Sequence, residues 1–317
     1  MAELNRRKIS IVVPFFNEEA GTAAFYSKLT NHLATLKSYD FEIVCVDDGS
    51  TDQTLAQLRA FVTLDPRFVV LELSRNFGKE VALTAGLDAA TGDAVIPMDA
   101  DLQDPPELIT SLIEQWERGF EVVLAKRADR STDSFLKRKT AELFYKVHNQ
   151  FSLVKIPENV GDFRLMDRVV LDALSQMSEQ QRFMKGLFAW VGFKTTTVTY
   201  QRQLRAAGES KFSGWKLWNF ALEGITSFSI SPLKFWTYLG LVGALTSLLY
   251  ALFIMFKTMM FGADVPGYPS LFVAIVFFGS VQLIGIGMLG EYIGRIYMEA
   301  KRRPLYFVRK RYANHQG

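Results

Sequence analysis

The chain has very little cysteine and almost no net charge, and both facts limit what it can be. Cys45 is the only cysteine among 317 residues, so a disulfide within the chain is excluded. A buried thiol in a reducing cytosol is the expected interpretation. The 36 Lys and Arg residues nearly balance the 33 Asp and Glu residues, which leaves a net charge of +3. This balance gives no support for a nucleic-acid partner.

Two phosphate-binding motifs are also missing. No G-x-G-x-x-G follows the first apolar run, and no G-x-x-x-x-G-K-[ST] occurs in the chain, which disfavours dinucleotide oxidoreductases and P-loop NTPases. What is present is an alternation of short β-branched runs with longer helical patterns. The runs lie at residues 9–16, 42–46, 68–73, 93–98 and 121–125. This alternation predicts an α/β fold, a mainly parallel sheet covered by helices.

Acidic and amide side chains follow three of these predicted strands. Asn17 and Glu18 follow the first, Asp47 and Asp48 the second, and Asp99-Ala100-Asp101 the fourth. In open α/β sheets, ligands bind beyond the carboxyl ends of the strands. We therefore expect these groups to face one cleft.

Asp99 and Asp101 are the candidate metal ligands. In an extended segment, residues two apart point to the same side, so both carboxylates are presented together and Gln103 continues that face. Carboxylates with substrate phosphate oxygens suit a hard divalent cation, which can neutralise a nucleotide pyrophosphate. The alternative is an ordinary capped turn between strand and helix, where acids are common.

The run from Asp47 to Asp52 is open to two interpretations. A turn followed by an N-capped helix explains Gly49 and Ser50 without any ligand. That account does not need two acids directly after the strand, and a carboxylate there could accept hydrogen bonds from a pyrimidine or ribose. The carboxylate of Glu18, which follows Pro14, could accept hydrogen bonds from a pyrimidine or ribose in the same way.

Two long apolar runs follow the α/β pattern. Trp236–Phe256 and Leu271–Gly290 contain no charged residue and are long enough to cross a bilayer as helices, although two buried helices of a soluble protein remain the alternative. Lys and Arg residues flank the pair on the outer sides, whereas the joining segment Gly262–Ser270 has one acid and no Lys or Arg. Both termini should therefore be cytoplasmic. The flanking cations are Lys211, Lys216, Lys234, Lys301, Arg302, Arg303, Arg309, Lys310 and Arg311.

The segment before the first apolar run predicts a helix lying on the membrane. Polar residues recur at helical spacing within Trp215–Ser229, although an amphipathic core helix would show the same pattern. The small residues Gly290 and Gly294 are spaced so that the two spans could pack through them. A homo-oligomer through the transmembrane helices is a further expectation. The expected division is a cytoplasmic α/β domain at 1–210, an interfacial region at 211–231, two transmembrane helices at 232–298 and a basic cytoplasmic tail at 299–317.

Several motifs together resemble those of the family-2 inverting glycosyltransferases with a GT-A (Rossmann-like) fold. Within that family, the chain looks like the bactoprenol glucosyltransferases of bacterial O-antigen modification, relatives of dolichol-phosphate mannose synthase. The resemblance covers nearly the whole chain. Its motifs are Val13-Pro14-x-x-Asn17-Glu18, Val46-Asp47-Asp48-Gly49-Ser50-x-Asp52, Arg75 to Glu80, Asp99 to Pro105, Gly161 to Met166, Gly208 to Phe212 and Leu222 to Ser229.

This resemblance implies transfer of glucose from UDP-glucose to undecaprenyl phosphate, with inversion and with Mg²⁺ or Mn²⁺ as cofactor, at the bacterial inner membrane. A processive polysaccharide synthase and a non-catalytic membrane adaptor or flippase component remain alternatives. Against the first, two spans make too few helices for a polymer channel. Against the second, Asp99, Asp101 and Gln103 are intact.

Transfer between two anionic groups requires fixed cations, because their repulsion must be offset. We expect Arg127 and Arg138 to take part in catalysis at the acceptor phosphate, with a basic helix predicted at 135–147. Further candidates for the same phosphate are Arg130, Lys137 and Arg164. Arg202 and Lys211 are expected at the donor pyrophosphate. Asp162 occupies the place where relatives with alcohol acceptors keep their base, and it either acts as a base or orients a neighbour.

Overall fold

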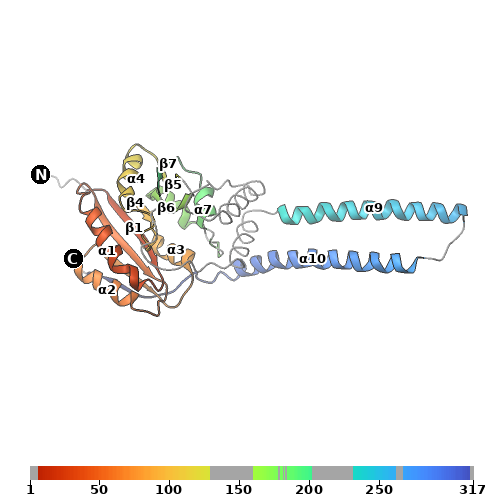
Figure 1. The fold of residues 1–317 in the computed structure, drawn as a ribbon, viewed down its shortest axis with the longest axis horizontal. Helices are drawn as coiled ribbons and strands as arrows, with labels where there is room; N and C mark the ends of the chain where they lie inside the picture. Colours follow the sequence, from red (N-terminus) through yellow and green to blue (C-terminus); the bar gives the residue numbers. More distant parts are fainter. Residues whose placement is uncertain are drawn as a thin grey trace.

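The protein is described by a computed structural model over residues 6–128, 160–177, 179–180, 182, 184–201, 231–261 and 267–314. Within these ranges, short strands and helices alternate first, and two long helices follow before a last strand (Figure 1). In chain order the elements are β1 (Lys8–Phe15), α1 (Glu19–Leu33), β2 (Asp40–Asp47), α2 (Thr54–Leu64), β3 (Phe68–Leu73), α3 (Lys79–Ala89), β4 (Ala94–Pro97), α4 (Leu108–Glu117), β5 (Val122–Arg127), β6 (Val160–Asp167), α6 (Arg168–Ser175), α7 (Met184–Trp190), β7 (Thr195–Tyr200), α9 (Ser231–Phe261), α10 (Tyr268–Ala300) and β8 (Val308–Ala313).

One sheet of eight strands organises the α/β part, in the order β7-β5-β6-β4-β1-β2-β3-β8. The central strands β4, β1, β2 and β3 are parallel neighbours, and β5 pairs with β7 in parallel. The pairs β4–β6, β5–β6 and β3–β8 are antiparallel. All five strands predicted from the sequence are present, so the expectation of a mainly parallel α/β sheet is confirmed.

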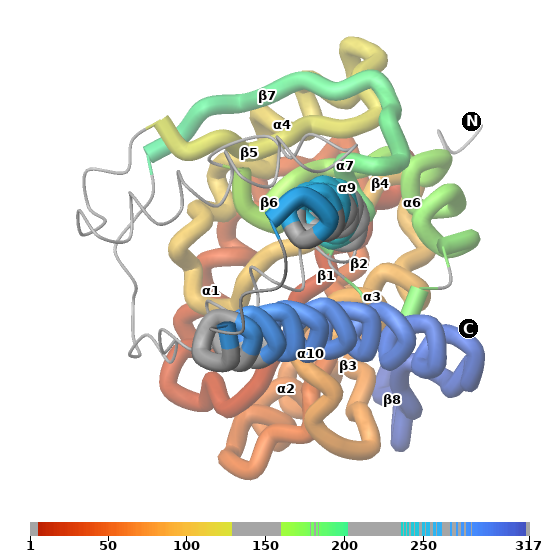
Figure 2. The backbone as a smooth tube through the Cα atoms, turned by 90° about the vertical axis from the view of Figure 1, so that its right-hand side faces the viewer, coloured from red at the N-terminus to blue at the C-terminus, as the bar shows by residue number. Residues whose placement is uncertain are grey.

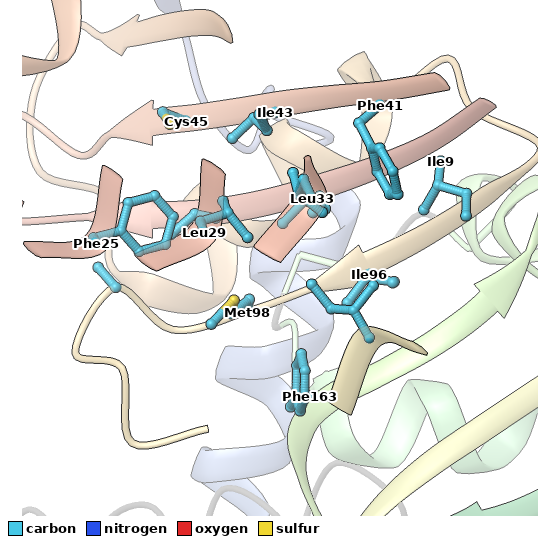
Figure 3. Close-up of a cluster of buried hydrophobic side chains, with 14 of the residues drawn as sticks. Ile9, Phe25, Leu29, Leu33, Phe41, Ile43, Cys45, Ile96, Met98 and Phe163 are labelled. Carbon is cyan, nitrogen blue, oxygen red and sulfur yellow. The ribbon is translucent and has the colours of Figure 1, made fainter. Parts of the chain in front are cut away.

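Helices cover both faces of this sheet. Side chains of α1, α2 and α4 pack on one face, with Phe25, Leu29 and Leu58 fully buried (Figure 3). Side chains of α3, α6 and α7 pack on the other face. Because both faces are covered, β1 and β2 are mostly apolar on both sides rather than alternating, with Ser10 and Glu42 as buried polar exceptions. Cys45 lies inside the first of these cores, and its burial raises the pKa of the thiol, as expected for a structural cysteine.

The two long helices α9 and α10 lie side by side and project away from the α/β part (Figures 1 and 2). They contain the two apolar runs found in the sequence, and the described side chains of those runs are mostly exposed. By length and composition, one helical segment among the described residues, Phe277–Ala300, could cross a membrane. The helices themselves are therefore found, while two spans remain a prediction.

The C-terminal residues return to the sheet. After α10, Val308–Ala313 forms β8, which pairs with β3 at the edge of the sheet. The Tyr312 hydroxyl donates to Glu72 at 2.7 Å, and the Arg309 guanidinium donates to the same carboxylate at 3.2 Å. The residues 299–317 were predicted only as a basic tail, so this strand was not expected.

Candidate active site

The first turn at the carboxyl edge of the sheet links the ends of β1 and β2. The main-chain N–H of Asn17 donates to Ser50 Oγ at 3.0 Å, and Asn17 Oδ1 accepts from the N–H of Thr51 at 2.8 Å. Asn17 adopts a φ of 53°, a left-handed conformation that Asn tolerates better than most residues. Asn17 thus shapes the turn, and Pro14 and Glu18 lie half-buried on either side of it.

Asp47 and Asp48 end β2 and are both almost completely buried. Asp48 accepts hydrogen bonds from the N–H groups of Phe77 at 2.7 Å and Gly78 at 2.9 Å. Asp47 accepts from the N–H of Ser50 through one oxygen, while its buried Oδ1 has no hydrogen-bond partner among the described residues. Burial raises the pKa of both carboxyls. Asp48 therefore fixes the neighbouring loop that carries Phe77 and Gly78.

The turn after β2 requires glycine at position 49. Its φ is 69°, and a Cβ built there would lie 2.6 Å from the carbonyl carbon of Arg75 and from the nitrogen of Asn76. No side chain fits against a main chain at that distance. The loops after β2 and β3 therefore come together only because residue 49 is glycine.

The D-x-D segment, which contains the predicted metal ligands, follows β4 directly. Asp101 Oδ1 accepts from the N–H of Gln103 at 3.1 Å, which folds the segment back on itself. Gln103 Oε1 is buried and has no hydrogen-bond partner in the described part of the chain. The described residues contain no group of three or more His, Cys, Asp or Glu that could hold a metal alone. Two carboxylates and one amide oxygen fit a hard cation whose other ligands come from substrate phosphates.

Lys79, the first residue of α3, connects Asp99 with Asp162. Its Nζ lies 2.7 Å from Asp99 Oδ1 and 2.9 Å from Asp162 Oδ2. The three residues come from α3, the end of β4 and β6, so the structure brings together two predicted site residues that are far apart in the sequence. Lys79 was not predicted as a site residue. Its place in the Arg75 to Glu80 motif, between β3 and α3, was the signal that could have found it.

The electrostatics around Asp162 keep it ionised. Burial by itself raises the pKa of Asp162, but the charges of Lys79 and Lys185 outweigh burial and hold that pKa well below its usual range. Burial also lowers the pKa of Lys79, and the carboxylates of Asp162 and Asp99 more than offset this, so its pKa is raised. Glu80 beside them behaves differently, because burial and the Asp162 charge raise its pKa to about 7.

Arg164 is placed differently from its prediction as an acceptor-phosphate ligand. Its side chain is buried, and its guanidinium donates to the carbonyl oxygens of Gly161 at 2.8 Å and Asp162 at 3.3 Å. It also stacks 4.2 Å from the centre of the Phe188 ring. Burial lowers the pKa of Arg164 to about 10. Because its donors face main-chain carbonyls inside the fold, Arg164 shapes the segment that carries Asp162.

Arg127, at the end of β5, lies next to this segment. A Cβ built on Gly161 would lie 3.6 Å from Arg127 Nη2. The Arg127 side chain hydrogen-bonds the Tyr200 hydroxyl, which also donates to the buried carboxylate of Asp104. Burial and the Asp104 charge raise the pKa of Tyr200 to about 12. Tyr200 and Asp104 were not predicted as site residues, and they orient Arg127.

Five predicted cations lie outside the described residues, so their roles stay predictions. The same applies to the predicted basic helix at 135–147 and to the interfacial helix at 215–229. The five cations are Arg130, Lys137, Arg138, Arg202 and Lys211.

Comparisons with known proteins identify the family of the chain. The family described as "Glycosyl transferase family 2" matches residues 10–175. A "prophage bactoprenol glucosyl transferase homolog" of Escherichia coli is 57% identical over 303 residues, covering 96% of this chain and 99% of that protein. The bactoprenol glucosyl transferase of Shigella phage SfV is 58% identical over 302 residues, covering 95% and 98%.

Solved structures are more distant. Glucosyl-3-phosphoglycerate synthase from Mycobacterium tuberculosis, in complex with Mn²⁺, UDP and phosphoglyceric acid, is 18% identical, with a TM-score of 0.47 over 69% of this chain and 76% of that chain. The family match covers more than half of the chain, and the curated relatives cover nearly all of it. The chain belongs to glycosyltransferase family 2.

Proposed function

We propose that this enzyme transfers glucose from UDP-glucose to undecaprenyl phosphate, giving a lipid-linked sugar for modification of an envelope glycan. The observation that carries the proposal is the identity of 57% to 58%, over nearly the full length of both chains, with proteins named bactoprenol glucosyl transferases. The site is consistent with it, because the carboxyl edge of the sheet offers separate places for a nucleotide, a cation and an anionic acceptor.

The nucleotide lies at the ends of β1 and β2 in this proposal. Asp47 Oδ1 is buried and has no hydrogen-bond partner among the described residues, and in this proposal it accepts a hydrogen bond from the uracil or ribose. Asp48 holds the loop of Phe77 and Gly78 against the site through two main-chain hydrogen bonds. Glu18 and Asn17 border the same space from the end of β1.

Asp99, Asp101 and Gln103 hold Mg²⁺ or Mn²⁺ in this proposal, together with oxygens of the donor pyrophosphate. The cation supplies charge neutralisation for the departing nucleoside diphosphate. The chain's own residues do the positioning. Arg127, held by Tyr200, offers a guanidinium fork to the acceptor phosphate.

Asp162 acts as a positioning residue rather than a general base. A phosphate monoester is already largely ionised near neutral pH, since its second pKa is about 6, and it needs no strong base to react. Asp162 is paired with Lys79 at 2.9 Å, and its low pKa makes it a poor proton acceptor. Its carboxylate instead keeps Lys79 fixed beside Asp99.

We also propose that α9 and α10 both cross the bacterial inner membrane, with the α/β part and both termini in the cytoplasm. This arrangement would place the site beside a lipid substrate. The support is the apolar, mostly exposed surface of the described side chains of both helices and the Lys and Arg residues that follow α10. An Asp264→Cys variant in the joining segment should react with an impermeant maleimide added outside intact cells. Protection of that thiol, with labelling only after lysis, would contradict the topology.

The activity test uses purified full-length protein in detergent with a panel of labelled nucleotide sugars and undecaprenyl phosphate. The expected product is an acid-labile lipid carrying one glucose, formed from UDP-glucose. Asp99→Asn should lower kcat by roughly 10²- to 10³-fold, because several kcal/mol of charge stabilisation depends on the cation. Asp172→Asn, an exposed acid on α6, is the matched control. A long polymer, or unchanged transfer by Asp99→Asn or in excess chelator, would contradict the proposal.

A further inference from the structure

We propose that Lys79 couples metal binding to nucleotide binding, by occupying Asp99 in the empty site and moving to the diphosphate when nucleotide and cation are bound together. This inference rests on the proposed function, since it takes UDP as the nucleotide. It assigns to Lys79 a positioning and binding role that neither the sequence pattern nor the comparisons give it.

The first step is the release of Lys79 from Asp99, and it follows from the difference in exposure between the two ion pairs of Lys79. The Lys79–Asp99 contact is 2.7 Å, with 46% and 31% of the two side chains exposed. The Lys79–Asp162 contact is 2.9 Å, but only 12% of the Asp162 side chain is exposed. A cation from solvent therefore reaches the Asp99 end far more easily. Lys79 can leave Asp99 while it stays anchored at Asp162.

The second step is competition for one carboxylate. Asp99 Oδ1 accepts the Lys79 ammonium at hydrogen-bonding distance, so a divalent ion bound to the same oxygen must displace that ammonium. A cation arriving alone also meets the repulsion of the nearby lysine charge. Without nucleotide, Lys79 therefore weakens metal binding.

The third step is the fate of the displaced ammonium. Lys79 is the first residue of α3, directly after Gly78, whose N–H is held by Asp48 at 2.9 Å. The loop that carries the lysine is thus fixed to the residue that ends β2, beside the proposed nucleotide position. A diphosphate bound between Asp48 and Asp99 lies within reach of a lysine side chain anchored at that point. The diphosphate replaces the partner that Lys79 has lost, so nucleotide and cation favour each other's binding.

The test measures Mn²⁺ binding to the purified full-length protein by electron paramagnetic resonance, with and without UDP and with no acceptor present. In the wild type, UDP should tighten Mn²⁺ binding. In Lys79→Met, the Kd for Mn²⁺ alone should fall by up to about fivefold, the range of a partly exposed ion pair. The tightening by UDP should shrink by at least the same factor, because the lysine–phosphate contact is lost.

Two controls separate competition from a general loss of charge. Lys185→Met removes a lysine whose charge also acts on Asp162, and it should keep the UDP effect of the wild type. Lys79→Arg retains the positive charge and should keep most of the UDP effect on Mn²⁺ binding. If Lys79→Met does not fold, as judged by circular dichroism, Lys79→Gln is measured in its place with the same expectation.

The outcomes distinguish this inference from the proposed function. Tighter Mn²⁺ binding without nucleotide, together with a smaller UDP effect, in Lys79→Met supports the inference. An unchanged UDP effect in Lys79→Met, with UDP still binding by calorimetry, overturns the inference and leaves the proposed function intact. A wild-type protein that does not bind UDP overturns both.

Discussion

The paired hydrogen bonds of Asp48 give the sharpest test of how the site is built. Asp48→Asn keeps the size of the side chain but leaves one acceptor oxygen where two N–H groups, at 2.7 and 2.9 Å, now find two. The new amide group faces an N–H donor at a position only 2% exposed. A hydrogen bond to a charged group contributes about 1.5 to 3 kcal/mol, and an unsatisfied buried donor costs about 1 to 3 kcal/mol. We expect a loss of roughly 2 to 4 kcal/mol.

The assay is thermal unfolding of the purified protein in detergent, followed by intrinsic fluorescence. For a domain of this size, a loss of that order lowers Tm by roughly 4 to 16 °C. Asp172→Asn should stay within about 0.5 kcal/mol of wild type, as exposed substitutions usually do. UDP binding should weaken in Asp48→Asn, because the loop that carries Lys79 loses an anchor. If Asp48→Asn unfolds like the wild type, the two hydrogen bonds do not fix this loop and the reasoning fails.

Three further predictions concern the surroundings of the site. In Glu80→Gln, denaturant unfolding should show a gain of about 1 kcal/mol at pH 8 and little change at pH 5. The folded-state pKa of about 7 lies above the unfolded value of about 4.3, so wild-type stability falls as pH rises from the unfolded pKa to the folded pKa. An equal gain at both pH values would contradict this. Gly49→Ala should lower the free energy of unfolding by several kcal/mol and abolish transfer, because the new Cβ would lie 2.6 Å from the Arg75 main chain. A variant with wild-type thermal stability would refute this prediction. Tyr312→Phe should lower the free energy of unfolding by about 1 kcal/mol, because it removes the hydrogen bond to Glu72. The main-chain amides of β3 should then exchange faster with solvent, and unchanged exchange would count against the prediction.

The sequence alone predicted strands β1 to β5, the acidic strand ends and the two long helices, but not β6, β7 or β8. Runs such as 43–46 are apolar at every position, and strands buried on both faces need that pattern. The positions of Asp47, Asp48 and Asp99 followed from the same argument, because the carboxyl ends of parallel strands meet at one edge. These features depend on neighbours in the sequence, which is why local patterns were sufficient.

The tertiary structure decided which side chains meet. Lys79 and Asp162 lie 83 residues apart, and no local pattern relates them. Arg164 looked like a phosphate ligand in the sequence, but β6 lies between β4 and β5 with its residues 163–166 buried, so its guanidinium turns to main-chain carbonyls. The residues of β8 looked like a solvated basic tail. They form a strand because the edge of β3 offers unpaired main-chain groups and a carboxylate, Glu72, that accepts from Arg309 and Tyr312.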